Sequence, residues 1–524
     1  MDVCADDFEQ TLPLLQKLVL DADFVGLDIE FTGLRSNLCG PQQISLFDLP
    51  SEWYLKTRQS VQQFTICQIG ESVQYVAHSC NFFLFPTTFG ILDSEFSFQA
   101  SSVQFLNQYG FNYNKFLKNG IPYMNEEQEK KIKHSILTGN WRVRSSLDKD
   151  QIKVVIDEVT RWLDLAEEGD WMTLPGIAGF QAFEVQLVLR QALPNIWTEL
   201  KEKGVMKKVS RQHRWYLEHA SCERASCWKE QILLSAKGFS VFFQMLVKAQ
   251  KPLVGHNMMM DLLHLHEKFF RPLPGRNKPA IVFPFSLVCC HKLLERLDIV
   301  LCDLWSELHF PRVSNLSEVY DVLNSNLNPT KNSGPVIVHA SKCERYAKTK
   351  CPHEAAYDAF LCGSVLLKVA HLLLQRVHSN APVPEPSFSQ YLGVLTPYVN
   401  QVNLIRAGVP KINFSGPDYP SVRPPILIVS IRRWPGVSEQ QIYCEFQNLC
   451  KFDVRRLTRN QFLLLTNKFK DARSVLKEYR CHPTLQVSLY RYWRHSPTIT
   501  CVLQVCGAVT TWALLAFFLG RASP

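Results

Sequence analysis

Two acidic residues two positions apart, Asp28 and Glu30, are the first side chains in this 524-residue sequence whose spacing suggests chemistry. They follow the apolar run Phe24 to Leu27, which is typical of a buried β-strand. Alternate residues of a strand project to the same face, so the two carboxylates point the same way. Such a pair repels unless a cation lies between its members, and Mg²⁺ prefers carboxylate oxygens. The pattern predicts a divalent-metal site, although an ordinary strand end at a surface can carry the same short motif.

Three more residues, much farther along the chain, fit the same site. Asp261 follows a predicted apolar strand at Lys251 to Gly255 and lies in the first turn of a helix, where its purely structural role would be to favour the helix dipole. His353 and Asp358 begin a second, longer apolar helix. Because they are five positions apart, we expect them on adjoining parts of one helical turn.

The order of these residues resembles that of the DEDDh 3′–5′ exonuclease superfamily: Asp-x-Glu, then Asp, then His-x-x-x-x-Asp. The chain is similar in particular to the poly(A)-specific ribonuclease (PARN) family, and most of all to its membrane-anchored members that trim pre-piRNAs. The similarity is carried by Asp28–Leu34, Phe111–Lys115 with Gly120–Tyr123, Gly255–Met258 and His353–Ala359. It implies an α/β chain with an RNase H-like DEDD nuclease fold.

The resemblance also implies a role for each site residue. The four acids Asp28, Glu30, Asp261 and Asp358 would hold two Mg²⁺ ions about 4 Å apart, with Mn²⁺ as a substitute. His353 would be the general base that takes a proton from the attacking water, since the pKa of histidine lies near neutrality. The products would be 5′-nucleoside monophosphates. The neighbouring Glu354 is expected to point elsewhere and to be structural.

A groove for the RNA 3′ end is a further implication of the resemblance. Its apolar contacts suit bases that pack on protein without sequence readout. They fall on Phe31, Leu34, Val103 and Phe105. For each of these residues, packing in the core is the alternative interpretation.

Composition limits the compartment and the partners. The formal net charge of +9 is consistent with binding a polyanion but does not require it. The first residues lack the basic and apolar regions of a signal peptide, so the seventeen scattered cysteines are expected to be free thiols in a reducing compartment. Cys289-Cys290-His291 lacks a second pair at zinc-finger spacing and predicts no metal site.

The length predicts several domains. The expected parts are a nuclease domain in two pieces (1–149 and 235–400), a small α+β insertion (150–234), a Pro-rich linker (401–424), a compact βαββαβ unit (425–494) and an apolar C-terminal segment (498–519). Within the first piece, strands are expected at Phe64–Ile69 and Tyr75–Phe85, joined by a short link at Gly70–Gln74. The insertion lacks the Arg-xxx-His motif of the family's nucleic-acid-binding domain, so its basic residues also fit a solvated face.

The βαββαβ unit resembles an RNA-recognition motif (RRM). Its aromatic signature is weak. In the PARN family a tryptophan of the second strand binds the mRNA cap, and the matching position here is about Arg456. We therefore do not expect cap binding, and we expect a packed or partner-binding role.

The segment 498–519 has no charged residue, and at 1.5 Å per residue it is long enough for the roughly 30 Å core of a bilayer. Arg491, Arg494 and His495 precede it, which favours a cytosolic enzyme with a C-terminal transmembrane tail anchor. A buried helix is the alternative. The resemblance implies the mitochondrial outer membrane, or else the endoplasmic reticulum, and partners that include PIWI proteins carrying pre-piRNA and a Tudor-domain scaffold.

One stretch departs from the family pattern. Gly275 to Leu304 contains no Asp-Thr-Lys, whose lysine helps to hold the substrate in relatives. Three functions stay open: trimming of single-stranded RNA 3′ ends, above all of PIWI-bound pre-piRNA; deadenylation of mRNA; and a catalytically inactive, membrane-tethered RNA-binding adaptor. The complete set of five catalytic positions argues against the adaptor, and the missing cap tryptophan argues mildly against the deadenylase.

Overall fold

The structure is a computed structural model of the chain. It describes residues 1–34, 44–48, 50–73, 76–88, 92, 94–137, 149–173, 179–199, 205–219, 228–274, 299–301, 315–325, 334–378, 386–403, 411–414, 424–432 and 436–521. The Cys289-Cys290-His291 run, most of the atypical 275–304 stretch and most of the 401–424 linker lie outside the described residues. The chain divides into two compact units: residues 418–524 with 41–56 and 404–412 form the second, and the remainder forms the first.

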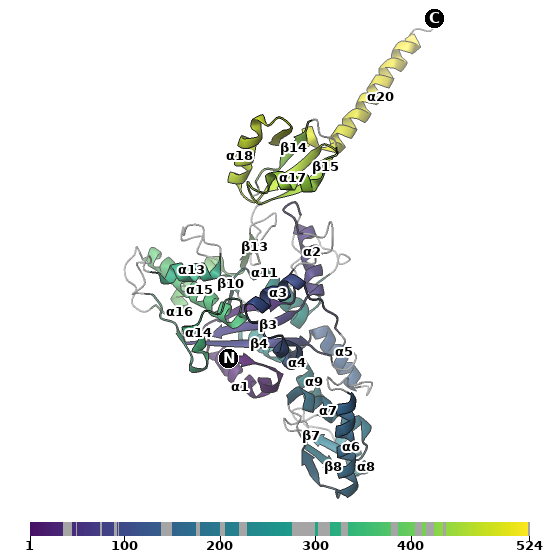
Figure 1. Ribbon diagram of the computed structural model, residues 1–524, viewed down its shortest axis with the longest axis vertical. Helices are drawn as coiled ribbons and strands as arrows, with labels where there is room; N and C mark the ends of the chain where they lie inside the picture. The colour runs from purple at the N-terminus through teal and green to yellow at the C-terminus, as the bar shows by residue number, and fades with distance from the viewer. Residues whose placement is uncertain are drawn as a thin grey trace. The chain divides into compact units, whose positions relative to one another are not determined.

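The first unit is built on one mixed β-sheet (Figure 1). The main path of the sheet is β1 (Asp2–Val3), β4 (Val76–Pro86), β3 (Ile66–Val73), β2 (Val25–Phe31), β9 (Leu253–Gly255) and β10 (Ile299–Leu301); β5 (Ile121–Tyr123) and β11 (Val338–His339) pair with β4. Because β2 pairs antiparallel with β3 and parallel with β9, it is an interior strand. The predicted α/β class is confirmed.

The link predicted at Gly70–Gln74 is wrong, because β3 continues through Gly70 to Val73. These residues pair with β2 on one side and with β4 on the other, and the hydrogen-bonding partners on both sides keep them extended. As a result Gly70 lies inside the sheet, directly opposite Asp28.

Helices cover both faces of this sheet. The long α15 (Ala355–Val377) packs on β2 and β3, and Phe24 belongs to the core that it forms. On the other face, α10 (Phe239–Ala249) brings Phe239 against Phe82, with ring centroids 5.1 Å apart. Leu27 lines the same small cavity as Phe239, so the alternation of β2 directs Asp28 and Glu30 toward α15.

Further described helices of the first unit are α1 (Ala5–Asp21), α3 (Ala100–Gln108), α4 (Tyr113–Asn119), α5 (Glu126–Leu137), α9 (Trp228–Lys237), α11 (Met259–Leu265), α13 (Leu316–Asn324), α14 (Arg345–Lys348) and α16 (Phe388–Leu395). The helix α2 (Pro50–Gln63) connects residues of both units along the chain.

Residues 149–219 form a small α+β region with its own apolar core. Its sheet has the order β6 (Trp171–Thr173), β8 (Val205–Lys208), β7 (Ile196–Glu199), and its helices are α6 (Lys149–Leu165), α7 (Gly179–Ala192) and α8 (Arg211–His219). The apolar positions of α6 that repeat at helical spacing supply Val155 and Val159 to this core, where Ile196 and Met206 meet them.

The second unit contains the βαββαβ element order. Its strands are β14 (Leu427–Ile431), β15 (Phe452–Thr458), β16 (Gln461–Thr466) and β17 (Leu485–Leu489), with α17 (Glu439–Phe446) and α18 (Phe469–Glu478) between them. The sheet is antiparallel with the order β15-β16-β14-β17. Ser438 and Gln441 form the capping box predicted at the start of α17.

Within the part of the chain that the structure describes, two helices are long and apolar enough to cross a membrane, and their surroundings differ. α15 is mostly buried and is the core helix of the first unit. α20 (Pro497–Arg521) follows the short α19 (Tyr492–His495). None of its side chains from 497 to 516 is buried. A C-terminal apolar helix therefore exists where the tail anchor is predicted.

Candidate active site

Three elements bring the predicted acids together. β2 supplies Asp28 and Glu30, α11 supplies Asp261, and the first turn of α15 supplies Asp358. The charges of Asp358, Glu30 and Asp261 all act on Asp28, so the four carboxylates form one electrostatic cluster.

A close approach of helix and sheet makes this cluster possible. A Cβ atom placed on Gly70 would lie 1.9 Å from the backbone carbon of Ala355, the first residue of α15. Only glycine leaves room for a backbone at that distance. Since Gly70 pairs with Asp28, the start of α15 and its Asp358 are drawn in beside the acids of β2.

Burial raises the pKa values of all four acids, and repulsion from neighbouring acids of the cluster adds to this effect at Asp28 and Glu30. Burial, followed by the charge of Asp358, raises the pKa of both Asp28 and Glu30 well above the ordinary range. Burial also raises the pKa of Asp261 to about 7 and that of Asp358 to about 6. Desolvated carboxylates that repel one another are the donor set that a hard divalent cation stabilises. The residues present therefore fit the predicted metal ligands.

His353 joins the cluster from outside the helix. We predicted that His353 and Asp358 share a helical turn; instead His353 precedes α15 and has a left-handed backbone, with φ of 62°. This conformation turns its backbone N–H toward Asp358, whose Oδ2 accepts a hydrogen bond of 3.0 Å. Possible ligand atoms of Glu30, His353 and Asp358 all lie within 4.8 Å of one another.

Two aromatic rings flank the imidazole of His353. Its ring centroid lies 4.5 Å from that of Phe105 and 4.3 Å from that of Tyr109, and these two centroids are 5.0 Å apart, so the three rings form one cluster. Burial lowers the pKa of His353, which favours the neutral imidazole that can accept a proton. Tyr109 was missed by sequence reasoning. Its position four residues after Phe105, which places both on one side of a helix end, is the signal that points to it.

A family model described as "CAF1 family ribonuclease" matches residues 3–366, a span that includes every residue of this cluster. The chain belongs to the CAF1 ribonuclease family. A mouse (Mus musculus) relative, "Poly(A)-specific ribonuclease PNLDC1", is 81% identical, with 100% of each chain covered. The "Pre-piRNA 3'-exonuclease trimmer" of Bombyx mori is 26% identical and covers 95% of this chain and 94% of its own length. The "Poly(A)-specific ribonuclease PARN" of Xenopus laevis is also 26% identical, over 86% of this chain and 74% of its own.

These similarities confirm the predicted relation to the PARN family and its pre-piRNA-trimming members. The chain is a 3′–5′ exoribonuclease of this CAF1 family. The family and the acidic cluster together imply dependence on divalent metal.

The four positions predicted to contact RNA differ in how much surface they offer. Leu34 is 46% exposed and Phe105 is 40% exposed, whereas Phe31 is 8% exposed and stacks on His264 with centroids 4.2 Å apart. The carbonyl of the half-buried Val103 accepts a hydrogen bond from the Tyr113 hydroxyl. In this CAF1-family site, Leu34 and Phe105 are thus open to a ligand, while Phe31 mainly packs. Tyr109, at 44% exposed, adds a third open apolar surface.

Proposed function

We propose that this chain trims the 3′ ends of single-stranded RNA, above all of PIWI-bound pre-piRNAs, and releases 5′-nucleoside monophosphates. The observation that carries the proposal is the proximity of five side chains. The possible ligand atoms of Glu30, His353 and Asp358 lie within 4.8 Å of one another. The charges of Asp358, Glu30 and Asp261 all act on the fifth side chain, Asp28. The strand order β4-β3-β2-β9-β10, with β3 antiparallel, supports the RNase H-like assignment.

In this proposal the four acids hold two divalent cations, Mg²⁺ or Mn²⁺. When bound, the two ions would stabilise charge on the scissile phosphate and lower the pKa of a water. His353 accepts the proton of the attacking water at an imidazole nitrogen, and the Asp358 carboxylate is held in place by the backbone N–H of His353. Phe105 and Leu34 pack against the last nucleotides without reading their identity.

Deadenylation of mRNA is the second candidate, because the mouse and frog relatives are named poly(A)-specific ribonucleases. Trimming of any sequence is favoured by the exposed apolar side chains of Leu34, Phe105 and Tyr109, which offer packing to every base. The inactive-adaptor alternative loses support, since the described catalytic residues lie together.

We propose that the βαββαβ unit is RRM-like and does not bind a cap. The order β15-β16-β14-β17 supports this assignment. Phe452 and Val454 point into its core, so Asp453 between them projects from the other face of β15. There Asp453 accepts hydrogen bonds from the Ser45 hydroxyl and the Leu46 backbone N–H, so Ser45 and Leu46 cover part of that face. This contact favours a packing role for the face over stacking of nucleic-acid bases.

We further propose that α20 anchors the enzyme in the mitochondrial outer membrane, or alternatively the endoplasmic reticulum, with the catalytic unit in the cytosol. The exposed, uncharged surface of α20 supports a membrane span. We propose a PIWI protein carrying pre-piRNA and a Tudor-domain scaffold as partners; the name of the Bombyx mori relative supports the pre-piRNA part of this proposal.

The test uses the full chain in detergent, two 5′-labelled RNAs and Mg²⁺. One RNA is oligo(A) and the other has mixed sequence, and Asp28→Asn is the inactive control. We expect a metal-dependent ladder that shortens both RNAs at similar rates from the 3′ end. A ladder on oligo(A) alone would favour deadenylation, and binding without any ladder would favour the adaptor.

A further inference from the structure

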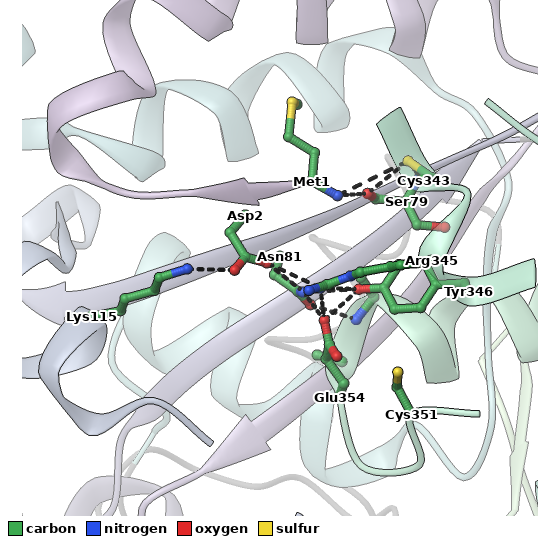
Figure 2. Close-up of polar contacts among 12 residues, drawn as sticks. Met1, Asp2, Ser79, Asn81, Lys115, Cys343, Arg345, Tyr346, Cys351 and Glu354 are labelled. Atoms are coloured by element: carbon green, nitrogen blue, oxygen red, sulfur yellow. Dashed lines mark hydrogen bonds and ion pairs between the residues drawn. The ribbon is translucent and has the colours of Figure 1, made fainter. Parts of the chain in front are cut away.

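The Glu354 carboxylate lies at the centre of a polar network beside the active site (Figure 2). Its Oε1 accepts hydrogen bonds from the Asn81 side-chain amide, the Tyr346 hydroxyl and the Arg345 guanidinium. Arg345 also pairs with Asp2 at 3.2 Å. Hydrogen bonds to an ionised carboxylate are stronger than neutral ones, so Glu354 is tightly tied to β4 and α14.

The same network holds the start of α15. The first amides of a helix have no partner within the helix. Here Asn81 Oδ1 accepts a 2.8 Å hydrogen bond from the Ala356 N–H, and Gln68 Oε1 accepts a 3.2 Å bond from the Ala355 N–H. Glu354 occupies the N-cap position, yet its side chain does not cap its own helix. Side chains of the sheet perform that role, and the Glu354 carboxylate anchors the chain to the same Asn81.

The residue immediately before this anchor is His353, in its left-handed conformation. A non-glycine residue in this region is strained and persists only where its neighbours hold it. The bonds on either side of His353 do so. The backbone N–H of Glu354 donates to Cys351 at 3.2 Å, and the backbone N–H of His353 donates to Asp358.

We propose that Glu354 is a positioning residue for His353. Its carboxylate fixes the backbone that follows His353, and the fixed backbone keeps the imidazole beside Glu30 and Asp358 and against the rings of Phe105 and Tyr109. Glu354 itself contacts neither RNA nor the reacting atoms. The inference rests on the proposed role of His353 as general base, and it assigns a function to a residue that the sequence marks only as structural.

A double-mutant cycle tests whether Glu354 acts through His353. Glu354→Ala, His353→Ala and the double variant are compared in the full chain with a mixed-sequence RNA. We expect Glu354→Ala to lower kcat by roughly 10- to 100-fold, with KM for RNA within about twofold, because misplacement of a catalytic group costs rate. In the His353→Ala background, the second change should have no further effect, since the two residues act as one unit.

Two further variants make the comparison specific. Glu354→Gln keeps an acceptor for Asn81 and Tyr346 and should recover most of the rate. Asp321→Ala removes a nearby but exposed ion pair with Lys350 and should leave the rate unchanged. Equal rate losses from Glu354→Ala in both backgrounds, or an unchanged kcat, would overturn the proposal.

Amide hydrogen exchange gives a readout that does not depend on RNA cleavage. Glu354→Ala should speed exchange in the peptide that covers Cys351 to Asp358, while α13 stays as in the parent chain. Unchanged exchange in that peptide would overturn the positioning role. A parent chain that trims no RNA, combined with faster exchange in the variant, would overturn the proposed function and still support the positioning role. If the alanine variant does not fold, Tyr346→Phe takes its place in both measurements, because it removes one donor to the Glu354 carboxylate and keeps the ring; the same pattern is expected with a smaller loss of rate.

Discussion

The backbone N–H of His353 and the Oδ2 atom of Asp358 are joined by a 3.0 Å hydrogen bond. The bond exists because His353 is left-handed and stands just outside the helix that carries Asp358. It links the proposed base to a proposed metal ligand, and it partly offsets the effect of burial by lowering the pKa of Asp358. The position of the His353 backbone and that of the Asp358 carboxylate therefore depend on each other.

Without metal, the folded protein should lose stability as the pH rises. Burial raises the folded-state pKa of Asp261 to about 7 and that of Asp358 to about 6, above the value of about 3.9 for an unfolded aspartate. A carboxyl group whose pKa is higher in the folded state than in the unfolded state stabilises the fold most at a pH below its unfolded-state pKa. This stabilisation is lost as the pH rises through its folded-state pKa. We expect the Tm in EDTA to fall between about pH 4 and about pH 8, and Mg²⁺ to reverse most of that fall. A Tm that is flat in EDTA and unmoved by Mg²⁺ would contradict this account.

Asp28→Asn should separate stability from activity. The amide removes one buried charge from a repelling cluster, so the metal-free variant should melt at a higher temperature than the parent at about pH 8. Trimming should fall by more than about 1000-fold, because a metal ligand is lost. Differential scanning fluorimetry in EDTA and gel-based RNA cleavage measure the two effects. Asp321→Asn, at an exposed ion pair, is the control that should change neither.

Gly70→Ala should damage the enzyme without touching an acid. The added Cβ would lie 1.9 Å from the backbone of Ala355, so β3 and α15 would have to separate. We expect a loss of more than about 3 kcal/mol in the free energy of unfolding, measured in urea. The matched control is Gly393→Ala within α16, where nothing lies within 4 Å of the new Cβ. That change should be neutral or stabilise by up to about 1 kcal/mol.

Phe105 and Tyr109 should bind the RNA end through base stacking. Stacking of a base on an aromatic ring contributes about 1 to 3 kcal/mol, so each alanine substitution should weaken RNA binding roughly tenfold. Fluorescence anisotropy in the Asp28→Asn background measures affinity without cleavage. The loss should be similar for oligo(A) and oligo(U), and it should vanish when the last nucleotide lacks a base. Tyr443→Ala, at a similarly exposed tyrosine of α17, should leave affinity unchanged; an equal loss there would argue against a specific 3′-end contact.

Removal of α20 should release the enzyme from membranes. The full chain is expected to stay in the pellet when membranes are extracted with alkaline carbonate, because residues 497–516 of α20 are uncharged and exposed. A chain that ends at Ser496 should move to the supernatant and keep its exonuclease rate. Extraction of the full chain by carbonate would show that α20 does not span a bilayer.

Local sequence patterns are enough to assign the site residues to their strands and helices. The period of a strand places Asp28 and Glu30 on one face, and apolar runs at strand and helix spacing mark β2, β9 and α15, because these patterns depend only on neighbours in the chain. The family relation could also be predicted, since its motifs are local. In the second unit, the Ser438 capping box and the βαββαβ order followed from the same kind of signal.

The way in which these strands and helices pack against one another depends on contacts between residues that are far apart in the chain. Gln68 lies 287 positions from Ala355, and Asn81 lies 275 from Ala356, yet their side chains hold the start of α15. No local pattern specifies such bonds, because they depend on the packing of β3 and β4 against the helix. For the same reason His353 was expected inside α15: its left-handed turn is imposed by Glu354 and Asp358 through contacts that the helical period does not encode.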